Sequence, residues 1–166
     1  MCADPDPGSG GRPDRHAQDA PVSFRRRSLG HASPPWVETG SLYFVTICCA
    51  TRGADMLIRP EVGRALLESA RVYHEKNRWY ARLFLAMPDH VHALLAFPPQ
   101  ENLSEVIRNW KSFTARKLGI EWQRNFFDHR LRSDEQWELK AEYIRQNPVR
   151  KGLISSAAQW PYLFES

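Results

Sequence analysis

The sequence has few cysteines, and they form no recognisable metal or disulfide pattern. Its 166 residues include three cysteines, Cys2, Cys48 and Cys49, and no CxxC pair. A disulfide framework and a cysteine-based zinc site are therefore not expected. Cys48 and Cys49 are adjacent, so on a strand their side chains would point to opposite faces. We interpret them as small apolar residues in a reducing compartment, the cytoplasm.

Long apolar runs are also missing from the chain. No segment approaches the roughly 20 apolar residues that a transmembrane helix needs. The N-terminus lacks the charged-then-apolar pattern of a signal peptide, so we expect a cytoplasmic protein without a membrane partner. A GxxxxGK[ST] loop is absent, which argues against the use of a nucleoside triphosphate. The net charge of +4 permits a polyanionic partner without demonstrating one.

The first part of the chain has almost no large aliphatic residues. Residues 1–35 are rich in Pro, Gly, Ser and Asp, so they bury too little apolar surface to offset their ordering entropy. We predict a disordered tail over residues 1–35 and one folded domain over residues 36–166. Three consecutive arginines, Arg25 to Arg27, could contact phosphates or form a solvated basic run.

Beyond the tail, the hydrophobic patterning predicts alternating strands and helices. We expect strands at 41–49, 79–87, 90–97 and 121–131, and helices at 59–77, 103–119 and 134–147. Capping residues support the last two helices: Asn102 and Gly119 bound one, and Ser133 and Pro148 bound the other. The last residues are expected to pack back onto the domain through Trp160, Tyr162 and Phe164.

The order strand, helix, strand, strand, helix, strand is that of ferredoxin-like folds. We therefore predict an α+β fold, a βαββαβ sheet with one face covered by the first two helices. An additional C-terminal helix, which carries Tyr143, follows the sheet. The second face of the sheet is then free for a ligand or for this additional helix.

Two histidines share one face of the third predicted strand. In MPDHVHALL, His90 and His92 are two residues apart and point the same way, whereas Val91 and Ala93 point toward the helices. Two imidazoles at this spacing can hold one divalent metal ion. They can equally be two histidines on a solvated sheet face.

The additional helix can bring a phenol and a carboxamide to the same place. Tyr143 and Asn147 are four residues apart and share a helix face, which Lys140 and Gln136 continue. A different, apolar face can dock onto the domain; it comprises Trp137, Ala141 and Ile144. Taken alone, Tyr143 could instead be a packed helix tyrosine, and Asn147 a helix-ending residue before a proline.

These side chains suit phosphodiester chemistry with Mg²⁺ or Mn²⁺ as cofactor. The oxygen of Asn147 suits Mg²⁺ or Mn²⁺, while imidazoles suit transition metals better. Such a metal polarises a phosphate oxygen, and a tyrosine oxygen can attack the phosphorus to give a covalent phosphotyrosine. Lys140, one turn before Tyr143, could stabilise the phenolate.

Five segments, in this order, resemble the REP-associated tyrosine transposases, which belong to the single-tyrosine branch of the HUH nucleases. They are YFVTICC, MPDHVHALLAF, WKSFTARK, WQRNFFDHRLRS and YIRQNPVRKGL. The resemblance covers about residues 36–155. It implies a ferredoxin-like nuclease fold that acts on single-stranded DNA and recognises hairpins of repetitive extragenic palindromes. It places the HUH motif on His90-Val91-His92, the nucleophile on Tyr143 and the third metal ligand on Asn147.

DNA contacts are predicted from basic and aromatic residues, because single-strand binders combine cationic tracks with stacking platforms. The cationic candidates are Arg108, Lys111, Arg116, Arg124, His129, Arg130 and Lys140. The aromatic candidates are Trp122, Phe126 and Phe127. Each could equally be a core aromatic or a solvated charge, but we expect them to gather near the site. The protein would act as a monomer or a homodimer.

The leading hypothesis is a metal-dependent single-stranded DNA endonuclease and strand transferase with a 5′-phosphotyrosine intermediate on Tyr143. The alternative is a domesticated protein that binds hairpin DNA without cutting it. A third hypothesis is a metal-dependent hydrolase in which His90 and His92 bind zinc and Tyr143 is structural. The target hairpin, the cleavage position, the native metal and the subunit that the tyrosine helix serves stay open at this point.

Overall fold

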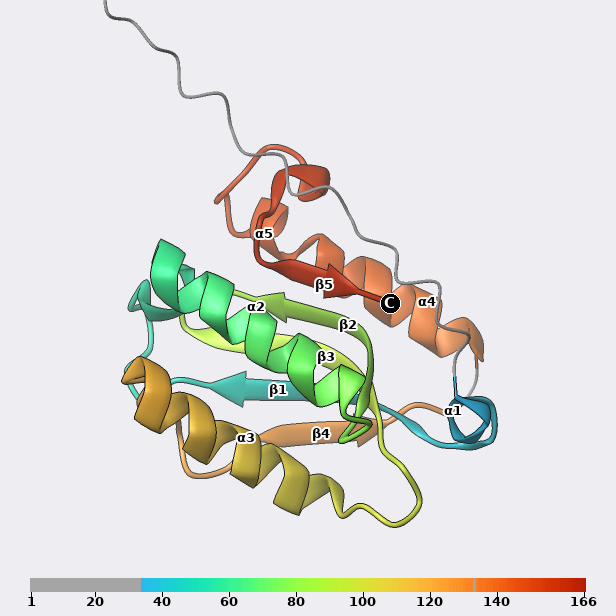
Figure 1. Ribbon diagram of the computed structural model, residues 1–166. Coiled ribbons are helices and arrows are strands. Elements are labelled where there is room, and N and C mark those ends of the chain that lie inside the picture. Colours follow the sequence, from blue (N-terminus) through green and yellow to red (C-terminus); the bar gives the residue numbers. More distant parts are fainter. Residues whose placement is uncertain (1–33, 133) are drawn as a thin grey trace, which may run out of the picture.

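The computed structural model describes residues 34–132 and 134–166, in which five strands form one antiparallel sheet of order β4-β1-β3-β2-β5 (Figure 1). The strands are β1 (Leu42–Cys48), β2 (Tyr80–Ala86), β3 (His90–Ala96), β4 (Phe127–Arg130) and β5 (Leu163–Glu165). The helices are α1 (Pro35–Thr39), α2 (Pro60–Glu75), α3 (Leu103–Leu118), α4 (Asp134–Arg145) and α5 (Asn147–Arg150). Short 3₁₀ turns are η1 (Met56–Ile58) and η2 (Ala157–Gln159). The predicted α+β fold with its βαββαβ order is confirmed.

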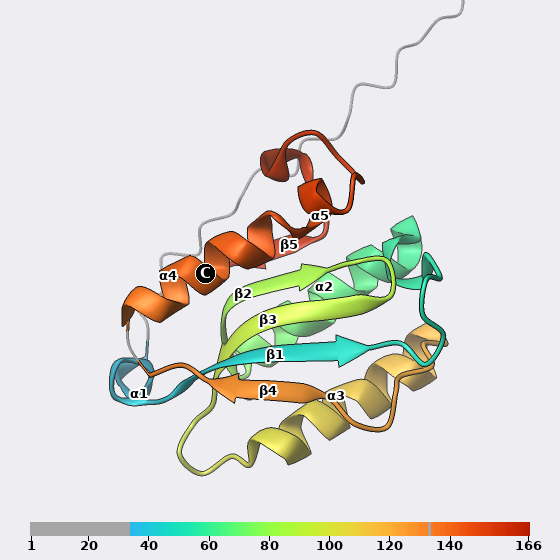
Figure 2. The same cartoon turned by 180° about the vertical axis from the view of Figure 1, so that it is seen from behind.

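The sheet is covered on both faces. Helices α2 and α3 lie on one face, and α4 lies on the other (Figures 1 and 2). The first face holds the main core, in which residues of alternating strand positions such as Val91 and Ala93 pack with Trp110 of α3. On the second face, Ala141 and Ile144 of α4 pack against side chains of β1, β2 and β3.

The face that carries the histidines is therefore not a solvated one. All seven residues of β3 are buried, and His90 and His92 are only 9% and 8% exposed. The apolar face predicted for the additional helix accounts for this, because Ala141 and Ile144 are fully buried against the sheet. Of the two uses open to this face, cover by the additional helix is the one observed.

Two elements are clearly shorter than predicted, and two others were not predicted. The strand expected at 121–131 is regular only at Phe127–Arg130, and before it only an isolated bridge joins Trp122 to Cys49. The helix expected at 134–147 ends at Arg145, because Pro148 has no N–H to continue the hydrogen-bond ladder. The proline instead lies in the first turn of α5. Helix α1 and strand β5 were not predicted, since five and three residues carry too little periodicity to be recognised.

The C-terminal segment packs back onto the sheet as expected. Trp160 is buried and its indole Nε1 donates a hydrogen bond to the carbonyl of Ala86 at 2.9 Å. The hydroxyl of Tyr162 donates to the carbonyl of Ile58 at 2.8 Å. These two bonds fix the segment at the end of β2, where β5 then pairs with that strand.

The residues predicted to cap α3 are confirmed. The Asn102 side chain accepts a hydrogen bond from the Glu105 N–H, and Gly119 closes α3 in the left-handed conformation with a φ of 67°. Ser133, the predicted cap of α4, lies outside the described residues, as does nearly all of the predicted tail over 1–35, which stays a prediction. Within the described segments, no helix has the length and apolar character required to cross a membrane.

Shortening Ile144 to alanine should destabilise the fold. The Ile144 side chain is fully buried between α4 and the sheet, and removing such a side chain typically costs about 2–5 kcal/mol. We expect the free energy of unfolding of Ile144→Ala to fall by that amount, and the midpoint of its urea denaturation to fall with it. Leu139→Ala is the matched control, because Leu139 is 74% exposed on the same helix. Equal midpoints for the two variants would contradict the docked position of α4.

Candidate active site

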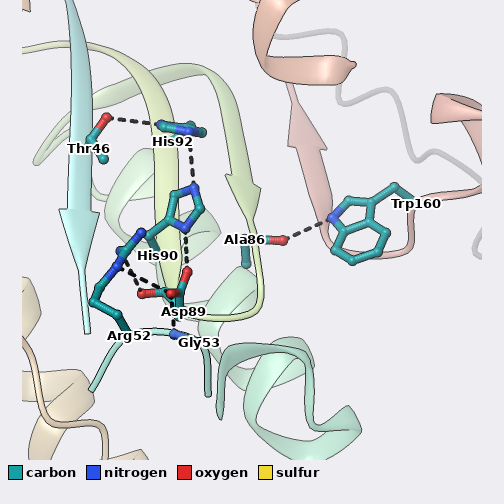
Figure 3. Close-up of polar contacts among 8 residues, drawn as sticks. All are labelled: Thr46, Arg52, Gly53, Ala86, Asp89, His90, His92 and Trp160. Carbon is teal, nitrogen blue, oxygen red and sulfur yellow. Dashed lines mark hydrogen bonds and ion pairs between the residues drawn. The ribbon is translucent and has the colours of Figure 1, made fainter. Parts of the chain in front are cut away.

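The two imidazoles meet edge to face on β3. The Nε2 atoms of His90 and His92 are 3.2 Å apart, and the rings are inclined at 78° (Figure 3). The far nitrogen of each ring is held by a different partner. The Nδ1 atom of His90 lies 2.6 Å from Asp89 Oδ1, and that of His92 lies 2.9 Å from Thr46 Oγ1. Both rings are thus fixed from behind with their Nε2 atoms converging.

Asp89 is itself held in place by the loop after β1. Its Oδ2 accepts the Gly53 N–H at 2.7 Å and lies 3.3 Å from Nε of Arg52 (Figure 3). Burial alone would raise the pKa of the Asp89 carboxyl, but the bonds from Gly53, His90 and Arg52 outweigh it and lower the pKa. An ionised Asp89 accepts the Nδ1–H of His90, which leaves the lone pair of that histidine on Nε2.

Both imidazoles are held in the neutral form. Burial is the main cause, and it lowers the pKa of His92 to about 3, with further lowering by His90, Arg52 and Lys140. Burial also lowers the pKa of His90, although the adjacent Asp89 opposes that shift. Neutral imidazoles are the form that binds metal ions.

The separation of the imidazole nitrogens fits a shared ion. Two ligands about 2.1 Å from one metal, at angles between about 90° and 110°, lie about 3.0 to 3.4 Å apart. The observed Nε2–Nε2 distance of 3.2 Å falls in that range, although a direct N–H···N bond between the rings has the same length. No three His, Cys, Asp or Glu side chains within 34–132 and 134–166 are arranged to hold a metal.

Tyr143 lies beside this pair in the same chain. Its ring centroid is 6.5 Å from that of His92, and the side chain is 42% exposed. Two cations face the phenol ring: Nζ of Lys140 at 5.5 Å and the guanidinium of Arg150 at 5.1 Å from the centroid. The tyrosine on α4 is therefore open to a ligand on one side and flanked by positive charge.

Asn147 lies one turn beyond Tyr143, although the two residues belong to different helices. Its side chain is 7% exposed, and its Nδ2 donates to the Tyr143 carbonyl at 3.1 Å. This bond commits the amide nitrogen and leaves Oδ1 as the available donor atom for a metal. The helical spacing that suggested the pair persists, because the chain turns helically through the α4–α5 junction.

The cations predicted for DNA contact do not gather at one place. Arg108 and Arg116 are exposed on α3, which covers the opposite face of the sheet from the histidines. The expectation that they lie near the site is wrong. Lys111 is buried, and its Nζ donates to the carbonyls of Gln123 and Arg124 at 2.7 and 2.9 Å. The long aliphatic stem lets Lys111 sit beside the buried face of α3 and still reach these acceptors.

The remaining basic candidates lie on or just before the edge strand β4. His129 and Arg130 are exposed on the edge strand β4, and Arg124 is exposed just before it. His129 pairs with Phe44 and so shares the histidine face, whereas Arg130 pairs with Tyr43 and points to the opposite face. A groove of about 550 Å³ opens at the end of β4; it is lined by Gly40, Ser41, His129, Arg130, Leu131 and Arg132.

Sequence reasoning missed four residues of the site: Thr46, Arg52, Asp89 and Arg150. Asp89 lies inside the MPDHVH motif, where a carboxylate next to a metal-type histidine was the available signal. Thr46 and Arg52 come from β1 and the loop after it, so only strand pairing brings them to the imidazoles.

A fold of this kind with a histidine pair on the central strand and a helix tyrosine beside it defines an HUH-type, transposase-like protein. A family model described as "Transposase IS200 like" matches residues 39–147, which include all three of these side chains. The chain therefore belongs to the IS200-like transposase family.

Individual relatives agree with this assignment. Two curated relatives named REP-associated tyrosine transposases come from Haemophilus influenzae, 28% identical over 143 residues, and Escherichia coli, 23% identical over 127 residues. The matches cover 74% of this chain in both cases, and 78% and 75% of the relatives. A solved REP-associated tyrosine transposase bound to a REP hairpin superposes with a TM-score of 0.66 at 22% identity, covering 75% of this chain and 76% of the other. The resemblance to REP-associated tyrosine transposases is confirmed.

Proposed function

We propose that this protein is a metal-dependent endonuclease and strand transferase for single-stranded DNA, with Tyr143 as the nucleophile. The phenol of Tyr143 loses its proton to water, and its oxygen attacks the scissile phosphorus. The bond from phosphorus to the 3′-oxygen breaks, and that oxygen takes a proton from water and leaves as a 3′-hydroxyl end. The 5′ phosphate stays on Tyr143 as a phosphotyrosine. A 3′-hydroxyl can later attack that phosphorus and release the tyrosine, so no nucleoside triphosphate is consumed.

The observation that carries this proposal is the position of Tyr143. A half-exposed phenol whose ring lies 6.5 Å, centroid to centroid, from one of two converging neutral imidazoles puts a candidate nucleophile beside the candidate metal ligands in one chain. A structural tyrosine that is half-buried against the sheet would have a similar exposure. The two cations over the ring, together with its position beside His92, favour the catalytic role.

His90, His92 and Asn147 are the residues that would hold Mg²⁺ or Mn²⁺. When bound, the metal polarises a non-bridging phosphate oxygen and neutralises developing charge. Lys140 and Arg150 stabilise the phenolate and the approaching phosphate by charge, since both lie over the Tyr143 ring. Asp89 and Thr46 position the imidazoles rather than contact the substrate.

Asp89→Asn should weaken metal binding. An amide can replace the carboxylate in shape, but its oxygen is a weaker acceptor for the His90 Nδ1–H. Loss of such outer partners typically costs about 10- to 100-fold in metal affinity. Titration calorimetry with Mn²⁺ measures the change, and Asp55→Asn, an exposed aspartate of the same loop, is the control. Equal Mn²⁺ affinity in the two variants would remove Asp89 from the site.

The proposed substrate is a DNA hairpin of the REP type with a single-stranded flank. The solved relative was bound to a REP hairpin. For backbone phosphates, this chain presents exposed basic residues on and just before the edge strand β4, of which His129 lies on the histidine face. We propose that one subunit suffices, because α4 docks on the sheet of its own chain and brings Tyr143 to its own histidines. The free thiols of Cys48 and Cys49 suit action in the reducing cytoplasm.

A denaturing gel tests the proposal. The full chain is incubated with Mn²⁺ and labelled REP-type hairpins with single-stranded flanks, and a labelled band that migrates with the protein is the expected result. The band should be lost with a chelator. Product without a covalent band would favour a hydrolase, and binding without cleavage would favour a hairpin-binding protein.

A further inference from the structure

One of the three predicted stacking aromatics lies exposed beside the site. Phe127 of β4 is 57% exposed. A single exposed aromatic residue is ordinary on a protein surface, so the position of Phe127 has to carry any inference. The other two predicted platforms are already engaged: Trp122 and Phe126 pack against the main core, and Trp122 donates to Thr114 at 2.9 Å.

Strand pairing places Phe127 in line with the catalytic histidine. Thr46 of β1 pairs with His92 on one side and with Phe127 on the other, so the three side chains form a row on one face of the sheet. Neighbouring strands are about 4.8 Å apart, so the backbones of Phe127 and His92 are roughly 10 Å apart. Phe127 therefore flanks the imidazole pair on the side of the open edge strand.

A chain of ring contacts links Phe127 to the site. Phe127 packs edge to face on Phe44, with centroids 6.2 Å apart. Phe44 in turn stacks on His92 at 5.5 Å and carries Nζ of Lys140 over its ring at 4.7 Å. Phe127 is thus in edge contact with Phe44, the ring over which Lys140 lies, and more than half of Phe127 is exposed.

We propose that Phe127 is a stacking platform for a nucleobase of the single-stranded DNA, adjacent to the scissile phosphate. A base laid on the ring would hold its nucleotide at the edge of the sheet while the neighbouring phosphate reaches the histidines and Tyr143. Stacking tolerates any base, so the platform fixes the strand without choosing its sequence. This inference rests on the proposed function.

The test measures binding separately from cleavage. Tyr143→Phe serves as the parent, and the probe is a fluorescent DNA hairpin with a single-stranded oligothymidine flank, followed by anisotropy with Mn²⁺ present. Adding Phe127→Ala should raise the Kd by about 5- to 100-fold, the usual effect of removing one stacking ring. Phe127→Trp should bind as tightly as the parent, whereas Phe127→Leu should bind as weakly as the alanine variant, because it lacks a π face.

Two controls make the result specific. Phe113→Ala removes an aromatic ring that is 38% exposed on α3, which covers the opposite face of the sheet, and should leave the Kd unchanged. The flank thymines are also replaced one at a time by abasic nucleotides. At one position this replacement should weaken DNA binding by the parent, and the same replacement should leave DNA binding by Phe127→Ala unchanged. Any of three results would overturn the proposal. These are unchanged DNA binding by Phe127→Ala, parent-like binding by Phe127→Leu, and an equal loss of affinity in both proteins when a flank thymine is made abasic.

The outcome is independent of the adduct experiment. Weakened binding by Phe127→Ala together with no covalent band would leave a hairpin-binding protein with a base platform. A covalent band together with unchanged binding would leave the enzyme and remove the platform.

Discussion

Tyr143→Phe will abolish the covalent protein–DNA adduct and leave hairpin binding intact. The substitution removes one oxygen from a ring that is already 42% exposed, so the fold and the cations over the ring are retained. Without that oxygen, the proposed nucleophile is gone. Removal of a catalytic nucleophile usually lowers turnover by roughly a thousandfold or more. The denaturing gel measures the adduct, and anisotropy with the same hairpin measures binding.

Tyr73→Phe is the matched control for that experiment. Tyr73 is also a helix tyrosine, but it lies on α2 and packs with Trp79 against the main core on the opposite face of the sheet. The adduct should form normally in this variant. An adduct on Tyr143→Phe, or its loss in both variants, would show that Tyr143 is not the nucleophile.

His90→Ala and His92→Ala will each remove metal-dependent cleavage. Either change removes one of the two converging Nε2 atoms and leaves a single imidazole. A metal that supplies several kcal/mol to a phosphoryl-transfer barrier accounts for roughly 10²- to 10⁴-fold in rate. We expect adduct formation to fall by that factor and Mn²⁺ binding to weaken in titration calorimetry, while hairpin binding persists.

His74→Gln provides the comparison for the histidine variants. The His74 imidazole lies on α2, where its Nδ1 accepts the Ala81 N–H at 3.1 Å. Adduct formation and Mn²⁺ binding should match the unmodified protein. Retention of Mn²⁺ affinity in both His90→Ala and His92→Ala would place the metal elsewhere, and circular dichroism of each variant excludes loss of the fold as the reason for lost activity.

Much of the architecture could be predicted from residues that are close together in the sequence. The period of two in HVHALLA puts His90 and His92 on one face whatever the partner strands are. The buried stripe of Ala141 and Ile144 follows from helical periodicity and dictates which face of α4 docks. Caps such as Asn102 and Gly119 depend on side chains a few residues away. These features were predictable because each depends on neighbours in the chain.

The predictions failed where the position of a side chain depends on residues that are distant in the sequence. Lys111 occupies a helix position that is typical of an exposed polar residue. Its ammonium group nevertheless donates hydrogen bonds to two backbone carbonyls after α3, and the side chain is buried. Arg108 and Arg116 are exposed, but the sheet separates them from the histidines. Periodicity gives the face of an element and says nothing of which other element lies near it.

The sequence by itself determined the order of the elements, the shared face of the two histidines and the helical spacing of Tyr143 and Asn147. Only the tertiary structure decided that the phenol lies 6.5 Å from the His92 ring, that Asp89 and Thr46 hold the imidazoles, and that Phe127 lines up with them across two strands. The physical reason is the range of the interactions involved. Backbone periodicity acts over a few residues, whereas strand register and helix docking join residues dozens of positions apart and depend on the packing of the whole core.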